Sequence, residues 1–241
     1  MSRGLFITGT GTGVGKTYVA ALIARVLRDS GKRVGVYKPV ASGCELDKGE
    51  PVSPDALALW EAAGRPGTLE QVCPQRFAAP LAPHLAARAE GRRVDPQLLR
   101  DGIKFWRETS DFVLVEGAGG LMSPLSDEDY NADLAAEFDY PLLVVSANVL
   151  GTINATLQTL ITADTYGRAG SKEQGARSKR SGGLIVRGVV LDSPTAATVD
   201  ASGASNADEL SCRCGVPLLA TVEHGGRFDR EVDWWTLATC T

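Results

Sequence analysis

Near its amino terminus the chain reads Leu5-Phe6-Ile7-Thr8-Gly9-Thr10-Gly11-Thr12-Gly13-Val14-Gly15-Lys16-Thr17. An apolar run leads into a glycine-rich turn, and the turn leads into residues typical of the first turn of a helix. This order of strand, loop and helix predicts a phosphate-binding loop. Its glycines let backbone N–H groups approach phosphate oxygens, Lys16 supplies a positive charge, and the Thr17 hydroxyl can ligate a magnesium ion.

The loop differs by one residue from the usual pattern of Gly, four residues and Gly-Lys-Ser/Thr. Thr10 stands at the first glycine position and Gly9 lies one residue earlier, so the loop counted from Gly9 is one residue longer than usual. The alternative interpretation is a turn that binds nothing. The strand expected before it and the helix expected after it favour a phosphate-binding loop.

The composition is that of an ordinary globular chain. Its 241 residues are enough for one α/β domain with a substantial core, and 44% of them are hydrophobic. The 25 basic and 29 acidic residues give a net charge of −4, and a mildly acidic chain is a poor general nucleic-acid binder. No apolar run reaches the roughly 20 residues that span a bilayer, and no secretory signal opens the chain. We expect one domain over residues 1–241, a cytoplasmic location, and neither nucleic acid nor membrane as a partner.

Strand and helix signals alternate along the whole chain. Further strands are expected at 33–37, 112–116, 141–146, 184–191 and 216–222, and helices at 18–27, 55–60, 95–107, 129–138, 151–166 and 201–214. The composition of 45–54 is loop-like, and 64–93 is a long irregular excursion of the kind usually kept for function. Residues 169–183 are basic and poor in hydrophobic side chains, which predicts a flexible insertion. The alternation predicts an α/β fold of the P-loop NTPase type, with a mostly parallel sheet and helices on both faces.

Polar residues stand where two of these strands end. Lys38 and Ser42 follow the strand at 33–37, and Glu116 ends the strand at 112–116. Ligands bind at the carboxyl ends of strands in open α/β sheets, and an acidic strand end beside a phosphate loop meets its metal ion. Alone, Lys38 could be a solvated strand-end lysine. The phosphate loop upstream favours a shared site.

Two other positions lie at expected helix starts. Asp55 falls in the first turn of a helix capped by Ser53, where spacing alone favours a carboxylate that complements the helix dipole. Gly151 and Asn154 open another helix, whose N-terminus could hold a carboxylate.

Taken together, these stretches resemble the dethiobiotin synthetase family. They follow one another in the family's order at 8–17, 38–43, 55–59, 82–84, 113–120, 124–127 and 150–154. The lengthened phosphate loop followed by Lys38-Pro39-Val40-Ala41-Ser42-Gly43 is the most specific part of the resemblance. Beyond Gly167 the likeness becomes weaker.

The resemblance implies an ATP-dependent ring closure. In the family, 7,8-diaminopelargonate reacts with CO2 or bicarbonate to give a carbamate, and ATP converts the carbamate into a carbamic-phosphoric anhydride. The second amine then closes the ureido ring and releases phosphate. Because two anions must meet, catalysis should consist mainly of positioning and charge neutralisation.

The resemblance also implies roles for individual residues. The catalytic set is Lys38, Lys16, Thr12 and Ser42, with Lys38 as the essential cation and Ser42 also touching the substrate. Mg2+ would be held by Thr17, Asp55 and Glu116. The nucleotide would be bound by Gly13, Val14, Gly15, Lys16, Thr17, Asp55, Glu116, Gly117, Ala118, Gly119 and Asp192. Gly151 and Asn154 would bind the substrate's carboxylate tail across a homodimer interface.

Three features depart from the family pattern. Gly11 replaces an aspartate that is common between the two threonines of the loop, which removes a carboxylate from the phosphate site. Asp192 replaces the asparagine that reads adenine in many members. An ionised aspartate cannot donate a hydrogen bond to the base, so we expect looser selectivity for the base. The insertion at 169–183 and the tail at 233–237 have no counterpart.

Two alternative functions belong to the same ATPase group. An amidotransferase-type cobyrinate synthase would normally need a glutaminase domain, for which this chain is too short. A partition or cell-division regulatory ATPase would carry a second lysine at the position of Gly11, and usually a membrane-binding or DNA-binding element. The sequence has neither feature.

Overall fold

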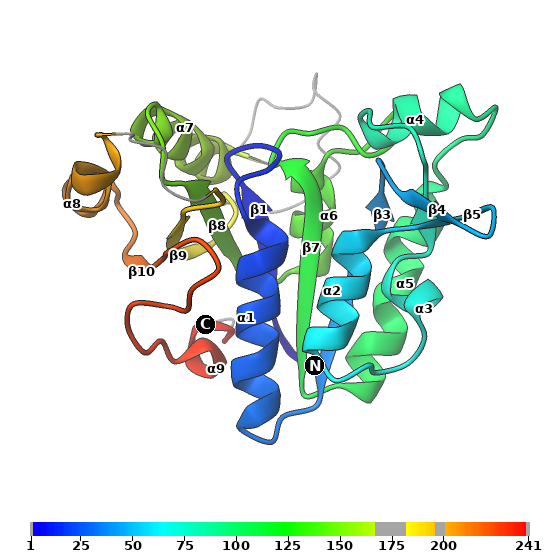
Figure 1. The fold of residues 1–241 in the computed structure, drawn as a ribbon, viewed down its shortest axis with the longest axis horizontal. Helices are drawn as coiled ribbons and strands as arrows, with labels where there is room; N and C mark the ends of the chain where they lie inside the picture. Colours follow the sequence, from blue (N-terminus) through cyan, green and yellow to red (C-terminus); the bar gives the residue numbers. More distant parts are fainter. Residues whose placement is uncertain (1, 167–181, 196–200, 240–241) are drawn as a thin grey trace.

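The computed structural model describes residues 2–166, 182–195 and 201–239. At its centre six parallel strands form one sheet in the order β10-β9-β8-β1-β7-β2 (Figure 1). They are β1 (Arg3–Gly9), β2 (Val34–Tyr37), β7 (Phe112–Gly120), β8 (Leu142–Ala147), β9 (Val186–Asp192) and β10 (Leu218–Val222). The predicted α/β fold is confirmed, and this sheet is parallel throughout.

Helices cover both faces of this sheet. In Figure 1, α1 lies in front of β1 and β7, and α6 lies behind β7. The helices are α1 (Lys16–Asp29), α2 (Pro54–Ala62), α3 (Leu69–Val72), α4 (Pro83–Ala89), α5 (Pro96–Thr109), α6 (Asn131–Phe138), α7 (Thr152–Thr165), α8 (Gly203–Arg213) and α9 (Trp234–Leu237). The predicted cap at Ser53 is confirmed, because its side chain accepts a hydrogen bond from the Ala56 N–H at 3.2 Å.

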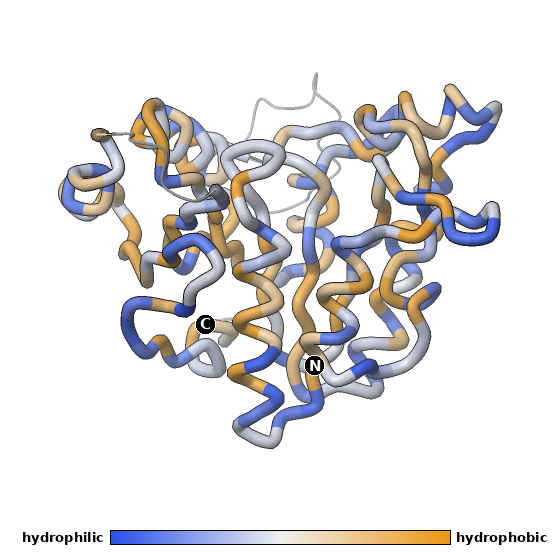
Figure 2. The backbone as a smooth tube through the Cα atoms, viewed as in Figure 1, coloured by the Kyte–Doolittle hydropathy of each residue, from blue (hydrophilic) through white to orange (hydrophobic). Residues whose placement is uncertain are grey.

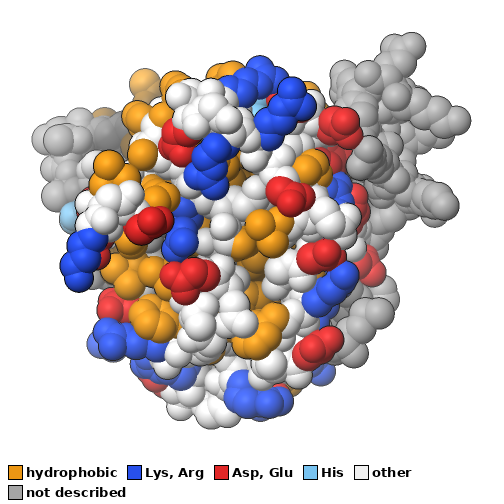
Figure 3. Space-filling view, turned by 90° about the vertical axis from the view of Figure 1, so that its right-hand side faces the viewer, with side chains coloured by type: hydrophobic (Ala, Val, Ile, Leu, Met, Phe, Trp, Pro, Cys, Tyr) orange, Lys and Arg blue, Asp and Glu red, His pale blue; other side chains and the backbone are white. Residues whose placement is uncertain are grey.

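The core follows from the burial of the central strands on both faces. Leu5, Phe6 and Ile7 of β1 are at most 1% exposed, as expected for a parallel strand that reads as a continuous apolar run. Hydrophilic residues lie at the outer turns, such as the turn after α1 and the turn between β4 (Glu45–Asp47) and β5 (Glu50–Val52) (Figure 2). Figure 3 shows that acidic and basic side chains are interspersed over one face of the molecule.

Two segments expected to be irregular contain regular structure. Residues 45–54 form a hairpin of β4 (Glu45–Asp47) and β5 (Glu50–Val52), with Lys48 and Gly49 at positive φ in its turn. Residues 64–93 contain α3, α4 and β6 (Gln75–Arg76), which pairs with β3 (Val40–Ala41). Sequence periodicity missed these elements because each is too short to show a period. A capping box fixes α3, with reciprocal bonds between Thr68 and Gln71.

The C-terminal tail packs against the rest of the fold. Trp234 is 2% exposed, and its ring lies 5.0 Å from that of Phe228. The Tyr18 hydroxyl of α1 donates to the Gly226 carbonyl at 2.7 Å. Most of the insertion predicted at 169–183 falls within 167–181, which lies outside the described residues. Among the helices that are described, none has the length and apolar character to cross a membrane.

Candidate active site

The carboxyl ends of the central strands open into one large cavity. Because β1, β2 and β7 are parallel and lie side by side, their last residues meet at the edge where α/β sheets bind ligands. The cavity has a volume of about 750 Å³. Of the residues predicted for the site, its lining includes Lys38, Lys16, Thr12, Ser42, Gly13, Gly15, Thr17, Asp55, Glu116, Ala118, Gly119 and Asp192.

The phosphate loop turns through two glycines in the left-handed region, Gly13 at φ 73° and Gly15 at φ 92°. Gly15 is also the N-cap of α1, so the unpaired N–H groups at the start of that helix are left for an anion. Lys16 folds back across the loop, and its Nζ donates to the Gly11 carbonyl at 2.8 Å. Burial lowers the pKa of the Lys16 ammonium, and the nearby Lys38 ammonium adds to this effect, while Glu116 and Asp55 offset it only in part.

Three charged side chains from three elements meet beside the loop. Lys38, directly after β2, is 3% exposed and pairs with Glu116 of β7, which is 1% exposed. The Lys38 Nζ also lies 3.1 Å from Oδ2 of Asp55, in the first turn of α2. Burial acts to lower the pKa of Lys38, but the two carboxylates outweigh it and hold that pKa above its ordinary value. Burial acts to raise the pKa of Asp55, but Lys38 outweighs it and keeps that pKa low.

Thr17 completes this cluster and makes it suitable for a divalent cation. Its hydroxyl donates to Glu116 Oε1 at 2.9 Å, while Glu116 Oε2 is buried without a hydrogen-bond partner in the described part of the chain. Within that part, no three His, Cys, Asp or Glu residues are grouped to hold a metal ion. Mg2+ needs only one or two carboxylates, because waters and phosphate oxygens supply its other ligands. Thr17, Asp55 and the unpartnered oxygen of Glu116 therefore fit Mg2+ beside a phosphate.

Another part of the cavity wall is formed by the end of β9 and the loops after β9 and β10. Asp192, Ser193, His224 and Gly225 line it, and Asp192 is 2% exposed. Burial raises the pKa of the Asp192 carboxyl to about 7, although His224 acts to lower it. Asp192 Oδ1 has no hydrogen-bond partner among the described residues. A Cβ on Gly15 would collide with this carboxylate, so Asp192 packs directly against the phosphate loop.

Four of the predicted residues lie outside the cavity lining. Val14 is 8% exposed and belongs to the hydrophobic core. Gly117 faces away, because a Cβ there would come within 2.6 Å of Asn131 Oδ1. Gly151 is the N-cap of α7 and Asn154 lies in its first turn, and both are exposed.

A set of buried hydroxyls that sequence analysis missed joins the phosphate loop to α7. Ser146 Oγ, at the end of β8, lies 3.2 Å from Thr10 Oγ1 and 2.7 Å from Thr152 Oγ1, and it accepts from Thr156 Oγ1 at 2.9 Å. Ser146, Thr152 and Thr156 are each at most 4% exposed. Scattered serines and threonines carry no local signal. Only the pairing of β1 with β8 brings these ones together.

Comparison with known proteins agrees with this geometry. A profile described as an AAA domain matches residues 3–231. The ATP-dependent dethiobiotin synthetase BioD of Rhodopirellula baltica is 42% identical over 228 residues, which cover 90% of this chain and 82% of that protein. The protein of the same name from Anaeromyxobacter sp. (strain Fw109-5) is 39% identical over 222 residues, which cover 92% and 90%.

Among solved structures, the signal recognition particle receptor FtsY from Elizabethkingia anophelis aligns at 14% identity with a TM-score of 0.47, covering 92% of this chain and 58% of that chain. That likeness is too slight to bear on function.

The parallel sheet, the phosphate loop and the matched domain define an ATP-binding enzyme of the P-loop class. Within that class, the chain belongs to the family of ATP-dependent dethiobiotin synthetases. The regulatory ATPase and the cobyrinate synthase considered above are therefore set aside.

The buried carboxyl of Asp192 should make stability depend on pH. Between about pH 4 and pH 7 the folded protein keeps a proton that the unfolded chain has lost, so the free energy of unfolding falls as pH rises, by at most about 1.4 kcal/mol per pH unit. Asp192→Asn removes this cost. We expect its advantage over the wild type, measured by urea unfolding, to grow through that window and level off above it. The growth should persist in a His224→Gln background. A pH-independent difference would contradict this assignment.

Proposed function

We propose that this protein converts 7,8-diaminopelargonate, CO2 and ATP into dethiobiotin, ADP and phosphate. The membership of the chain in the dethiobiotin synthetase family supports this reaction. The observation that carries the proposal is the buried Lys38 ammonium, held beside Lys16 at the mouth of an extended phosphate loop. Binding ATP alone needs one such cation, whereas joining a carbamate to a phosphoryl group needs more positive charge, because both reactants are anions.

For this reaction the protein mainly has to position the reactants and neutralise their negative charge. A carbamate oxygen bonds to the γ-phosphorus while the bond to the β–γ bridging oxygen breaks and leaves ADP. The second amine then attacks the carbamate carbon, phosphate departs with the bonding electrons, and the nitrogen loses a proton. Lys16 and Lys38 neutralise the oxygens that gather charge, while Thr12 and Ser42 hydrogen-bond the carbamate or amines from the cavity wall.

Thr17, Asp55 and Glu116 would hold Mg2+ in this enzyme. When bound, Mg2+ neutralises charge on the β- and γ-phosphates. The support is the unpartnered Glu116 oxygen beside the Thr17 hydroxyl. Lys38 shares both carboxylates, so its ammonium lies within one ion-pair distance of the metal ligands.

The base of the nucleotide would lie against Asp192. When ionised, this carboxylate accepts hydrogen bonds but cannot donate one, whereas the protonated acid can do both. We infer that the enzyme selects its nucleotide base loosely at alkaline pH.

A homodimer would complete the substrate site. Gly151 and Asn154 are exposed and lie outside the cavity of their own chain, so a role with the substrate tail requires a second copy. The same region carries exposed apolar side chains, with Leu150 at 82% and Ile161 at 64% exposure. A second copy packed against this region would cover these two side chains.

The proposed reaction predicts a strict substrate requirement. The purified protein should release phosphate from ATP only when diaminopelargonate, bicarbonate and Mg2+ are all present, because the γ-phosphate has no acceptor until the carbamate forms. Phosphate release and dethiobiotin formation should be measured together, with a Lys16→Met variant as the background. Steady hydrolysis without the diamine, stimulated by DNA or lipid vesicles, would refute the synthetase assignment.

The second prediction concerns Lys38. Lys38→Ala should lower kcat by at least about a thousandfold, since it removes the cation next to the carbamate. Nucleotide affinity, measured with a fluorescent ATP analogue, should change only a few-fold. Lys38→Arg is the matched control because it keeps the charge partner of Glu116 and hence the fold. If nucleotide binding vanished in a folded variant, the role given to Lys38 would be wrong.

The third prediction concerns the dimer. Wild-type protein should sediment as a dimer, and Leu150→Glu should shift it to monomer because a charge is buried in the interface. The variant should raise the KM for diaminopelargonate by about tenfold or more and leave nucleotide affinity unchanged. Val26→Glu, at a position 47% exposed on α1, serves as the control. A wild-type monomer with full activity would rule out the shared site.

A further inference from the structure

One buried amide fixes the backbone that follows Glu116. Asn131, the first residue of α6, is 0% exposed. Its Nδ2 donates to the carbonyls of Ala118 and Gly120, both at 2.7 Å, and its Oδ1 accepts from the Ala118 N–H at 3.2 Å. Both amide hydrogens and one oxygen lone pair are therefore used on the same stretch of β7.

This amide takes the place of a missing strand. β2 accompanies β7 only as far as Val115, so the backbone beyond Glu116 has lost that neighbour. Ala118, Gly119 and Gly120 are half-buried, and N–H and C=O groups left unpaired away from water would be costly there. Asn131 pairs with these groups of Ala118 and Gly120. The glycine-rich stretch at 117–120 is therefore held in one conformation, although its composition alone would allow several.

The segment held in this way is a wall of the active-site cavity. Ala118, Gly119 and Ser123 line the cavity, and Ser123 Oγ accepts from the Gly120 N–H at 2.8 Å. The wall stands directly against the phosphate loop, because a Cβ on Gly119 would lie 3.5 Å from Thr12 Oγ1. A Cβ on Gly120 would lie 3.3 Å from the Gly9 carbonyl.

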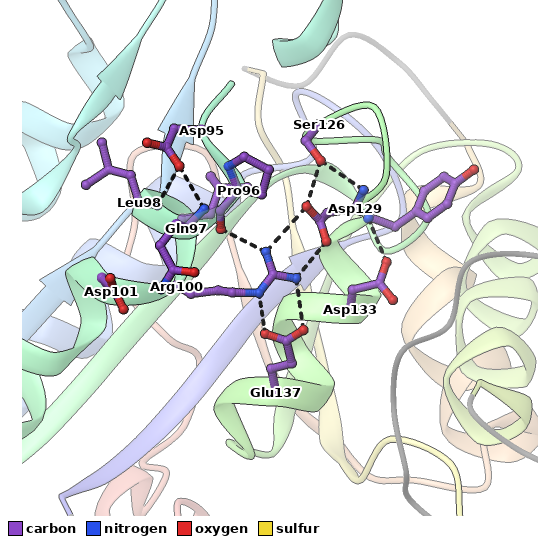
Figure 4. Close-up of polar contacts among 12 residues, drawn as sticks. Asp95, Pro96, Gln97, Leu98, Arg100, Asp101, Ser126, Asp129, Asp133 and Glu137 are labelled. Carbon is purple, nitrogen blue, oxygen red and sulfur yellow. Dashed lines mark hydrogen bonds and ion pairs between the residues drawn. The ribbon is translucent and has the colours of Figure 1, made fainter. Parts of the chain in front are cut away.

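The amide itself is anchored from behind. Figure 4 shows the Arg100 guanidinium of α5 between Asp129 and Glu137, with Ser126 bonded to Asp129. Arg100 bonds Asp129 at 2.7 Å and Glu137 at 2.6 Å, and the Ser126 hydroxyl donates to Asp129 at 2.7 Å. Asp129 is 2% exposed and lies two residues before Asn131. Because α6 is tied to α5 at its start, Asn131 holds the wall from a fixed point.

We propose that Asn131 is a positioning residue for phosphoryl transfer: its amide fixes the Ala118–Gly120 backbone against the phosphate loop before substrates bind. This inference rests on the proposed function. It assigns to Asn131 the placement of the wall next to Thr12, which bears on the transferred group. The part of the cavity around Asp192 and His224 is built by other segments, the end of β9 and the loop after β10.

The test compares two perturbations of this contact with one control. Asn131→Asp has the same shape but replaces both N–H donors with an acceptor. Gly117→Ala presses on the amide from the other side, since its Cβ would lie 2.6 Å from Asn131 Oδ1. The control is Tyr166→Phe. It removes the buried 2.7 Å hydrogen bond that the Tyr166 hydroxyl donates to Asp133, which lies on α6 as Asn131 does, and this bond is outside the cavity.

Three quantities are measured for each variant: kcat for dethiobiotin formation, nucleotide Kd, and hydrogen exchange of the peptide that contains Ala118. We expect both test variants to lose protection at Ala118 and to lower kcat by about tenfold or more, with Kd within about twofold. Tyr166→Phe should keep protection and kcat. If Asn131→Asp does not fold, the result for Gly117→Ala alone tests the positioning role of Asn131.

Normal kcat in a variant that has lost protection at Ala118 would overturn the proposal. So would a parallel fall in kcat and nucleotide affinity that Tyr166→Phe reproduces, because that is what a general loss of stability would cause. If wild-type protein makes no dethiobiotin, the proposed function fails. Hydrogen exchange at Ala118 would then still report whether the amide holds the wall.

Discussion

The buried ion pair between Lys38 and Glu116 is the interaction on which the site depends. Taking two charges out of water costs several kcal/mol for each ion, by order of magnitude, unless partners surround them. Here the partners come from separate elements. Thr17 of α1 donates to Glu116, and Asp55 of α2 pairs with Lys38. The loops after β1 and β2 must therefore lead into helices that start beside the end of β7.

The order of strands in the sheet makes this meeting possible. β7 lies between β1 and β2, although Glu116 follows Lys38 by 78 residues in the chain. Parallel strands bring their carboxyl ends to one edge of the sheet. The phosphate loop after β1, Lys38 after β2 and Glu116 of β7 therefore meet without a long loop between them. The excursion between β2 and β7 then folds as short elements on the outside. Its Ala82 and Pro83 return to line the cavity.

Much of this could be predicted from the sequence because the decisive signals are local. The phosphate loop, the acid that ends β7 and the lysine after β2 are each visible within a few residues. Asp55 was different, since its spacing suited a helix-dipole role, and only the resemblance suggested a metal ligand. The structure gives a physical reason to group it with the others, namely its 3.1 Å contact with Lys38.

What sequence could not predict are contacts between distant polar residues. Asn131 and Ser146 stand in unremarkable contexts, and their partners are backbone groups and hydroxyls that only the tertiary fold supplies. Short elements such as α3 were also not predicted, because four residues are too few to show a helical period. The tail was unplaced for a similar reason. Nothing local says that Trp234 will pack against Phe228 beneath the loop that carries His224.

Buried polar atoms without hydrogen-bond partners indicate where a ligand can bind. In the described part of the chain, five buried side-chain atoms lack a hydrogen-bond partner, and two of them belong to cavity residues. They are Glu116 Oε2, whose carboxylate accepts from Thr17, and Asp192 Oδ1, whose carboxylate packs against Gly15 of the phosphate loop. Leaving such atoms unpaired costs folding free energy, which a ligand recovers when it supplies the missing partner. A cation bound at Glu116 and a hydrogen-bond donor bound at Asp192 would satisfy both. A cation at Glu116 accounts for only one of the two atoms, so the cavity keeps a second unsatisfied carboxyl oxygen beside the phosphate loop.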